Sequence, residues 1–97
     1  MKSVMIVFNQ ALTERVNYMF QQLRITGYTM FPLVYGAGTN GGEPRMGSHT
    51  WPEMNSCYIT VVEDEMVPLL LKYSQRLDET NKANGLRVFV WNIEQTY

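Results

Sequence analysis

The sequence predicts an α+β domain with the ferredoxin-like arrangement, in which a four-stranded antiparallel sheet carries two helices on one face. Short runs of β-branched and aromatic residues, typical of strands, are interspersed with two longer segments that have the apolar spacing of a helix. Their order is strand, helix, strand, strand, helix, strand, which is the split βαβ pattern. The 97 residues suit one domain, and we expect residues 1–97 to form it, with a long loop at 36–56.

The first half of the chain is predicted to hold one helix between two strands. Residues 4–8, VMIVF, have the pattern of a buried strand, and Asn9 is placed to cap the helix that follows. Gly27 is the expected end of that helix. Residues 28–35 form the second strand, and Pro32 within it indicates an edge strand, a bulge or an early departure from the sheet. The apolar face of the helix consists of Leu12, Val16, Met19, Phe20 and Leu23.

The second half repeats the unit and completes the sheet. Residues 57–62, CYITVV, are the third strand, and Asp64 is placed to cap a second helix that has Pro68 in its first turn. Gly85 marks the exit from this helix, and residues 86–93 form the fourth strand. The inner stripe of the helix consists of Met66, Leu70, Tyr73 and Leu77.

The composition argues against several classes of function. A formal net charge of -1 and a pI near 5.7 give no electrostatic reason to bind nucleic acid or an anionic membrane. No stretch has the length of a membrane span, and the opening MKSVMIVF has the pattern of a strand, so we expect neither membrane insertion nor a signal peptide. The single cysteine, Cys57, fits a reducing compartment, so we expect a cytoplasmic protein.

The predicted last strand is apolar on both of its faces. Its alternating positions are Leu86, Val88 and Val90 on one face and Phe89, Trp91 and Ile93 on the other. Two helices cover only one face of a sheet, so the second face needs a cover from elsewhere, and we expect another copy of the chain to supply it. The alternative is that the aromatic residues near the end of the chain fold back over their own sheet.

Several stretches together resemble the P-II signal-transduction superfamily. They are the opening MKSVMIVF, the segment LRITGYTMFPLVYGAG that leads from a helix into a strand ending in Gly-x-Gly, the CYITVVEDE after the loop, and the terminal GLRVFVWNIE. The resemblance implies a homotrimer whose sheets pack inward around a threefold axis, with small-molecule effectors such as adenine nucleotides bound in clefts between subunits. It also implies a regulatory role, in which the long loop contacts a larger target protein such as a membrane transporter or an enzyme.

The resemblance places ligand-binding residues at the base of the loop and at the entry to the last strand. The Gly-x-Gly corner contains Gly36, Gly38 and Thr39, and the later turn contains Gly85 and Arg87. Family members that bind ATP typically have a basic, glycine-rich turn at the second place, whereas this chain has NKANGLRVFV. The glycines of the corner also fit the alternative of a loop that is only flexible. The loop contains no tyrosine, so the uridylylation known in the enteric branch has no acceptor there.

Three loop residues are candidates for contact with the target protein, namely Arg45, His49 and Trp51. Trp51 precedes a proline and offers a stiff aromatic side chain of the kind that anchors many interfaces. Arg45 is able to pair with a carboxylate of a partner or with an anionic ligand. The alternative is that Trp51 packs into its own domain and holds the loop down.

A sulfur-rich set around the single histidine suggests an alternative function. Met46, His49, Met54 and Cys57 follow one another at separations of three, five and three residues. Thioether, imidazole and thiolate together suit Cu(I) better than Zn(II). The alternative is therefore a metal-binding or metal-responsive trimer that uses His49 with nearby sulfur, although methionine and cysteine at such positions also serve as ordinary packing residues.

The sequence has no pattern of a catalytic site. Acid–base or nucleophilic catalysis needs convergent groups, and one histidine, one cysteine and scattered carboxylates show no such grouping. The adjacent Glu63, Asp64 and Glu65 precede a helix, where they interact favourably with its dipole. We therefore predict a regulatory protein and not an enzyme, and a purely structural trimer without a ligand is the third class to consider.

Overall fold

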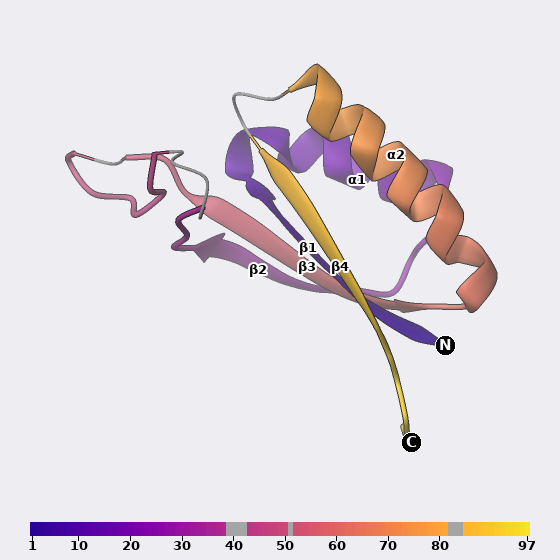
Figure 1. Cartoon of the computed structure of the whole chain (residues 1–97). Helices are drawn as coiled ribbons and strands as arrows, with labels where there is room; N and C mark the ends of the chain where they lie inside the picture. The colour runs from indigo at the N-terminus through magenta and orange to yellow at the C-terminus, as the bar shows by residue number, and fades with distance from the viewer. Residues whose placement is uncertain (39–42, 51, 82–84) are drawn as a thin grey trace.

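The computed structural model describes residues 1–38, 43–50, 52–81 and 85–97. Figure 1 shows a twisted sheet with two helices lying on one of its faces. No helix in these described ranges has the length and apolar character needed to cross a bilayer. The elements are β1 (Lys2–Asn9), the 3-10 helix η1 (Gln10–Leu12), α1 (Thr13–Gln22), β2 (Thr29–Val34), β3 (Asn55–Val62), the 3-10 helix η2 (Asp64–Met66), α2 (Val67–Thr80) and β4 (Leu86–Asn92).

The four strands form one sheet in the order β2-β3-β1-β4, and every neighbouring pair is antiparallel. This confirms the predicted ferredoxin-like α+β fold. β1 is central and pairs along its length with β3 on one side and with β4 on the other. β2 is an edge strand, and its register shifts between Phe31 and Val34, where Pro32 has no amide proton to donate.

The core lies between the sheet and the helices, and Tyr58 is its largest fully buried side chain. The Tyr58 ring packs edge-on against Phe8, with ring centroids 5.4 Å apart, and stacks on Tyr28 at 5.0 Å. Burial raises the pKa of the Tyr58 hydroxyl, which donates a hydrogen bond to Oδ1 of Asn17 on α1. Tyr58 also packs against Phe20 of α1, with ring centroids 5.2 Å apart, so aromatic packing and a polar contact both join sheet and helix here.

Only one of the two predicted helix caps has the predicted role. The Oδ1 atom of Asn9 accepts a hydrogen bond from the Ala11 amide at 3.0 Å, which confirms Asn9 as the cap of η1. Asp64 does not cap α2, because it lies inside η2, whose preceding residue Glu63 makes no side-chain cap bond either. The N-terminal amine lies 3.1 Å from Asp64 Oδ1, and the hydrogen bond to this amine lowers the pKa of Asp64.

The predicted end of the first helix at Gly27 is wrong. The helix ends earlier, because Arg24 takes the left-handed conformation, with φ 58°, that usually belongs to a glycine after a helix. The Ile25 amide donates to the Phe20 carbonyl at 2.9 Å, and the Arg24 amide donates to the Gln21 carbonyl at 3.1 Å, which are the two bonds of a Schellman motif. The physical reason for the early stop is packing, since it places Ile25 in the core beside the end of α1.

The sheet face opposite the helices is largely apolar and open. Cross-strand partners lie on the same face of a sheet, so the register aligns apolar side chains in rows across it. The rows are Phe31, Cys57, Val7 and Arg87; Thr29, Ile59, Met5 and Phe89; and Val61, Ser3 and Trp91. Phe89 and Trp91 remain 53% and 46% exposed, so the prediction of two apolar faces is confirmed and the alternative, that the chain end covers its own sheet, is wrong.

Replacing Arg24 by glycine is expected to raise the free energy of unfolding by about 0.5–1 kcal/mol. A side chain in the left-handed region costs about 1–2 kcal/mol, and the greater freedom of glycine in the unfolded chain cancels part of the gain. Urea unfolding followed by circular dichroism measures the change. Gln21→Gly, within α1, is the matched control and should lower stability by about 0.5–1 kcal/mol. A loss of stability in Arg24→Gly would contradict the assigned end of α1.

Candidate functional site

The loop after β2 is fastened at its root by backbone hydrogen bonds. Gly36 and Arg45 form an isolated antiparallel bridge, in which the Gly36 amide donates to the Arg45 carbonyl at 2.9 Å and the Arg45 amide donates back at 2.6 Å. Near the other end of the loop, the Gln10 amide donates to the Met54 carbonyl at 3.0 Å. These bonds tie the root of the loop together and to η1, and they determine where the Arg45 side chain leaves the backbone.

Two buried asparagines lie beneath this root, at the end of β1 and the start of β3. Asn9 and Asn55 are register partners and are only 2% and 6% exposed. Asn55 lies so close to the loop that a β-carbon at Gly36 would be 2.5 Å from its Nδ2 atom, so any other residue there would force the Asn55 side chain to move. The backbone N–H of Asn9 donates a hydrogen bond to the Gly85 carbonyl at 3.2 Å. The pair therefore adds a polar row at the end of the open, apolar sheet face.

The Arg45 side chain reaches from the loop across this polar row. Its Nη1 atom donates to Asn55 Oδ1 at 3.2 Å. Gly85 has a φ of 73°, and a β-carbon there would lie 3.0 Å from Arg45 Nη2, so the absence of a side chain makes room for the guanidinium. Loop, β3 and the entry to β4 thus meet at one cation. We call this region the Arg45 corner, and it is formed by Asn9, Gly36, Arg45, Asn55 and Gly85.

The Arg45 corner contains hydrogen-bond donors without acceptors. Arg45 Nε and Asn9 Nδ2 are buried nitrogens that have no hydrogen-bond partner among the described residues. The described residues of the chain form two ion pairs, one between the N-terminal amine and Asp64 and one between Arg87 and Asp78. Neither includes Arg45, so no described carboxylate neutralises it. Buried donors cost free energy when they stay unpaired, and an arginine fork matches the oxygens of a carboxylate or a phosphate. Chemically, the corner is suited to an anion that brings several acceptor oxygens.

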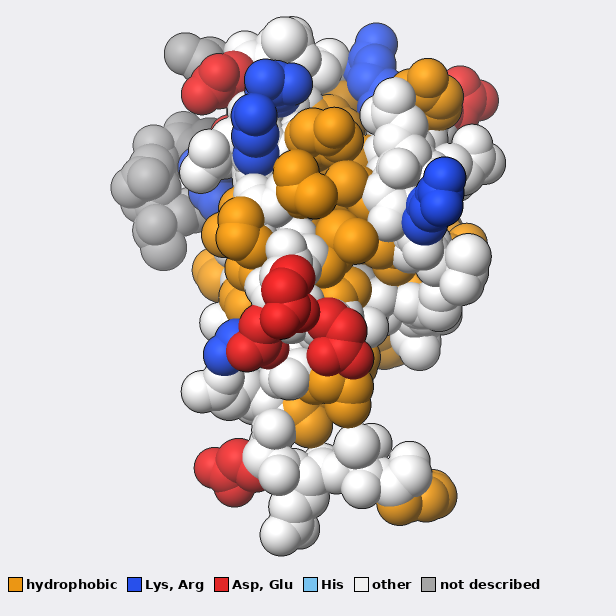
Figure 2. Space-filling model, turned by 90° about the vertical axis from the view of Figure 1, so that its right-hand side faces the viewer, with side chains coloured by type: hydrophobic (Ala, Val, Ile, Leu, Met, Phe, Trp, Pro, Cys, Tyr) orange, Lys and Arg blue, Asp and Glu red, His pale blue; other side chains and the backbone are white. Residues whose placement is uncertain are grey.

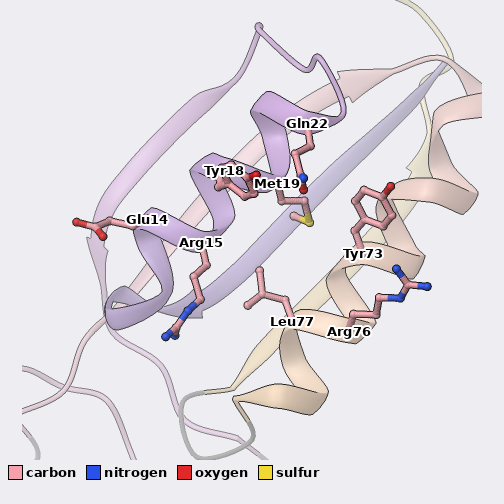
Figure 3. A pocket seen from close by; sticks show the side chains of 8 residues that line it. All are labelled: Glu14, Arg15, Tyr18, Met19, Gln22, Tyr73, Arg76 and Leu77. Atoms are coloured by element: carbon pink, nitrogen blue, oxygen red, sulfur yellow. The ribbon is translucent and has the colours of Figure 1, made fainter.

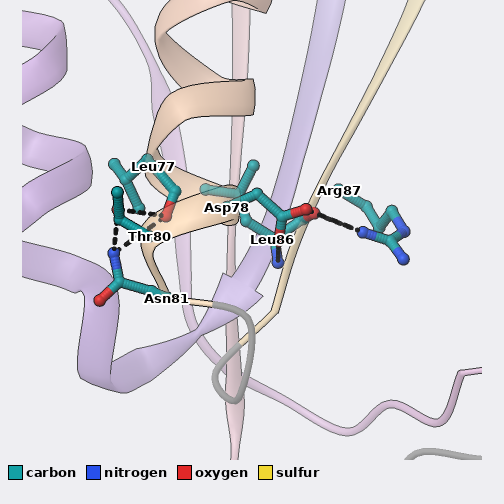
Figure 4. Close-up of polar contacts among 6 residues, drawn as sticks. All are labelled: Leu77, Asp78, Thr80, Asn81, Leu86 and Arg87. Atoms are coloured by element: carbon teal, nitrogen blue, oxygen red, sulfur yellow. Dashed lines mark hydrogen bonds and ion pairs between the residues drawn. The ribbon is translucent and has the colours of Figure 1, made fainter.

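The turn that carries Gly85 is held in place by the end of α2. Asp78 accepts a hydrogen bond from the Leu86 amide at 2.9 Å and lies 3.4 Å from the guanidinium of Arg87 (Figure 4). The Gly85 amide donates to the Asn81 carbonyl at 3.2 Å. Asp78 therefore positions the start of β4, and with it the glycine over which Arg45 lies.

The structure separates the residues that the sequence predicted to bind a ligand. Gly36 and Gly85 lie in the Arg45 corner, where each is required for a close approach. Gly38 is exposed, and a β-carbon there would meet no atom within 4 Å. Arg87 is directed to Asp78, and its side chain is 67% exposed. Thr39 lies outside the described residues, and the ligand-binding role of the whole set stays a prediction.

The predicted target contacts have different surroundings. Arg45 is half-buried and turned toward the sheet, whereas His49 is exposed and Trp51 lies outside the described residues. For the metal hypothesis, Cys57 is buried on β3, and this burial raises the pKa of its thiol. In the described part of the chain, no three His, Cys, Asp or Glu side chains are grouped so that they could hold a metal ion. Target contact and metal binding by His49 both stay predictions.

Sequence reasoning missed Asn55 and treated Asn9 only as a helix cap. The available signal was an asparagine directly at the end of each apolar run, in the stretches VMIVFN and NSCYITVV. An asparagine at a strand end that is buried must find hydrogen-bond partners in the interior, so each of these positions indicated a polar contact with another segment. The antiparallel register decides which two strand ends meet. This register cannot be predicted from the spacing of residues within either strand.

Gly85→Ala is expected to lower the free energy of unfolding by about 1–2 kcal/mol. The new β-carbon would sit in a left-handed backbone conformation and within 3.0 Å of the Arg45 guanidinium. Urea unfolding checks the value. Gly27→Ala is the matched control, because nothing lies within 4 Å of its β-carbon position, and it should be neutral or slightly stabilising. Equal effects of the two substitutions would contradict the close contact at Gly85.

The chain matches known proteins by family and by fold. The family model for nitrogen regulatory protein P-II matches residues 1–97. No curated protein matches the sequence significantly. A structure of CPII, a PII-like protein from Thiomonas intermedia K12, bound to ADP and bicarbonate, is 25% identical, covering 95% of this chain and 84% of that chain with a TM-score of 0.74. A putative PII-like signaling protein from Thermus thermophilus is 26% identical, covering 95% and 85%, with a TM-score of 0.68.

A second CPII structure, bound to ADP, AMP and bicarbonate, has a TM-score of 0.75 at 24% identity and covers 95% of this chain and 84% of that chain. At that identity, the likeness supports the fold, which agrees with the strand order β2-β3-β1-β4. The family model extends over all the elements described above. The chain therefore belongs to the nitrogen regulatory protein P-II family.

Proposed function

We propose that the chain is a P-II-like signalling protein of the cytoplasm that assembles as a homotrimer, binds an adenine nucleotide or bicarbonate at the Arg45 corner, and contacts a target protein through residues 36–56. The observation that carries the proposal is the buried, unpartnered donor set around Arg45. CPII, which shares this fold, is bound to ADP and bicarbonate in its structure. Both ligands are anions with several acceptor oxygens, and acceptors are what the unpaired donors of the corner need.

The open face of the sheet supports self-association. Phe31, Phe89 and Trp91 expose about half of their surface on one contiguous face, and exposed apolar patches of this kind mark protein interfaces. The Arg45 corner lies at the end of the same face. A sister chain packed against the apolar rows would therefore stand beside the corner and supply a second wall for a bound ligand.

In the proposed site, the loop supplies the cation, because the turn before β4 has no basic glycine-rich sequence and its one lysine, Lys82, lies outside the described residues. That turn retains Gly85 but no basic glycine-rich sequence, and Arg87 is directed to Asp78. Arg45 enters from the loop and occupies the space above Gly85. Its planar guanidinium is able to bind a phosphate or carboxylate through two hydrogen bonds at once. The phosphate-binding charge is thereby located on the loop and not on the sheet.

This location links ligand binding to the state of the loop. Arg45 is part of the bridge with Gly36 at the loop root, so a ligand that draws its guanidinium away from Asn55 also acts on that bridge. For such a switch to work, the ligand must favour one loop state by a few kcal/mol. The target protein, such as a membrane transporter or an enzyme, would contact the loop at residues such as His49 and Trp51.

Phe89→Glu is expected to dissociate the trimer, because it would bury a carboxylate within the apolar face that the subunits share. Sedimentation equilibrium measures the mass in solution. Leu69→Glu is the matched control, since Leu69 is similarly exposed, at 45%, but lies on α2, away from the open face, and this variant should remain a trimer. A monomeric wild-type protein, or equal dissociation by both variants, would argue against assembly through the sheet.

Arg45→Gln is expected to weaken ADP binding by about tenfold or more, because a hydrogen bond between charged groups contributes about 1.5–3 kcal/mol. Isothermal titration of ADP, and separately of bicarbonate, measures the affinity. Arg24→Gln removes an exposed charge outside the corner and should leave the affinity unchanged. If wild-type protein binds neither anion, or if Arg45→Gln binds as the wild type does, the corner is not the ligand site.

A further inference from the structure

A groove runs along the outer side of the helix layer, between α1 and α2. It has a volume of about 470 Å³. Figure 2 shows hydrophobic side chains gathered in a band on the α2 side of the molecule, with basic side chains beside its upper part and acidic side chains both near that part and in a cluster lower down. The groove lies on the opposite side of the sheet from the open face, so a trimer formed through that face would leave it accessible. Its main lining residues are Arg15, Tyr18, Met19, Tyr73, Arg76 and Leu77.

The floor of the groove is apolar and its position is well defined. Figure 3 shows Met19 of α1 and Leu77 of α2 directed into the space between the two helices. The Ser74 hydroxyl donates to the Met19 sulfur at 3.7 Å, which ties the helices together under the floor. Tyr18 is 60% exposed beside the floor and offers an aromatic wall that nothing in the described chain covers. This surface would gain from the burial of an apolar ligand.

Two arginines flank the apolar floor without a carboxylate partner. Arg15 donates from Nη1 to Asn81 Oδ1 at 2.9 Å, and Arg76 lies over the Tyr73 ring with its guanidinium carbon 5.9 Å from the ring centroid. Both contacts hold an arginine beside the groove without neutralising it, since neither of the ion pairs of the described residues includes Arg15 or Arg76. The one carboxylate of the lining, Glu14, points away from α2 in Figure 3.

We propose that this groove binds an amphiphilic carboxylate, that is, an acyl or aryl chain that ends in one carboxylate. The chain would lie over Met19 and Leu77 beside Tyr18. The carboxylate would accept hydrogen bonds from Arg15 or Arg76, whose guanidinium groups point away from each other in Figure 3, once that side chain turns toward the groove. The volume falls within the range of about 300–1,000 Å³ that is typical of small-molecule sites, and such sites combine an apolar lining with a few polar groups. The groove is a second ligand site, separate from the Arg45 corner and independent of the function proposed for that corner.

Octanoate is the probe that tests this assignment, with octan-1-ol as the uncharged control of equal chain length. Titration into ¹⁵N-labelled full-length protein should give saturable amide shifts at α1 and α2, with a dissociation constant on the order of 1 mM for so small a ligand. The double variant Arg15→Gln/Arg76→Gln should weaken octanoate binding by about tenfold and leave the weaker binding of octanol unchanged.

Lys72→Gln provides the matched variant, because Lys72 is an exposed cation of α2 that does not line the groove, and its loss should change the affinity by less than about twofold. The arginines are exposed, so both variants should keep the wild-type circular dichroism. The proposal is overturned if octanoate shows no saturable binding, if the shifts map to the open sheet face, if octanol binds as well as octanoate, or if Lys72→Gln weakens binding as much as the double variant.

Discussion

The antiparallel register of β1 between β3 and β4 is the constraint on which the rest of the structure depends. β1 pairs along its length with β3 on one side and β4 on the other, and its alternating side chains therefore decide what lies on each face of the sheet. Val4, Ile6 and Phe8 enter the core under the helices, while Met5 and Val7 lie on the open face. A slip of one residue would exchange the two faces, so the register is specified by the core and determines the outer surface at the same time.

The same register produces the polar end of that surface. Asn9 and Asn55 follow the apolar rows as the last paired residues of β1 and β3, and the Asn9 amide bonds to Gly85 ahead of β4. Side-chain amides that are buried at strand ends need partners. The Asn55 side chain accepts a hydrogen bond from Arg45 of the loop, and the Nε atom of this arginine stays unpaired. The Arg45 corner is thus a direct consequence of where the strands begin and end.

The molecule separates its surfaces by their physical character. The sheet face is apolar and broad, which suits contact with another protein, and the Arg45 corner at its end is cationic and confined. The helix layer on the other side carries an apolar floor between two arginines. A domain of 97 residues buries a limited share of its own surface, so covering the sheet face by association would add apolar burial that one chain alone lacks.

The sequence by itself determined the fold class and the order of the elements, because hydrophobic spacing is a local property. Pro32 predicted that β2 is an edge strand, has a bulge or leaves the sheet early, and the tertiary structure placed it at the edge. Local patterns did not reveal the early end of α1, where packing of Ile25 outweighs the preference for glycine. Only the tertiary structure decided that Asn9, Arg45, Asn55 and Gly85 meet. These residues are far apart in the chain, and strand pairing, which acts between segments, is what brings them together.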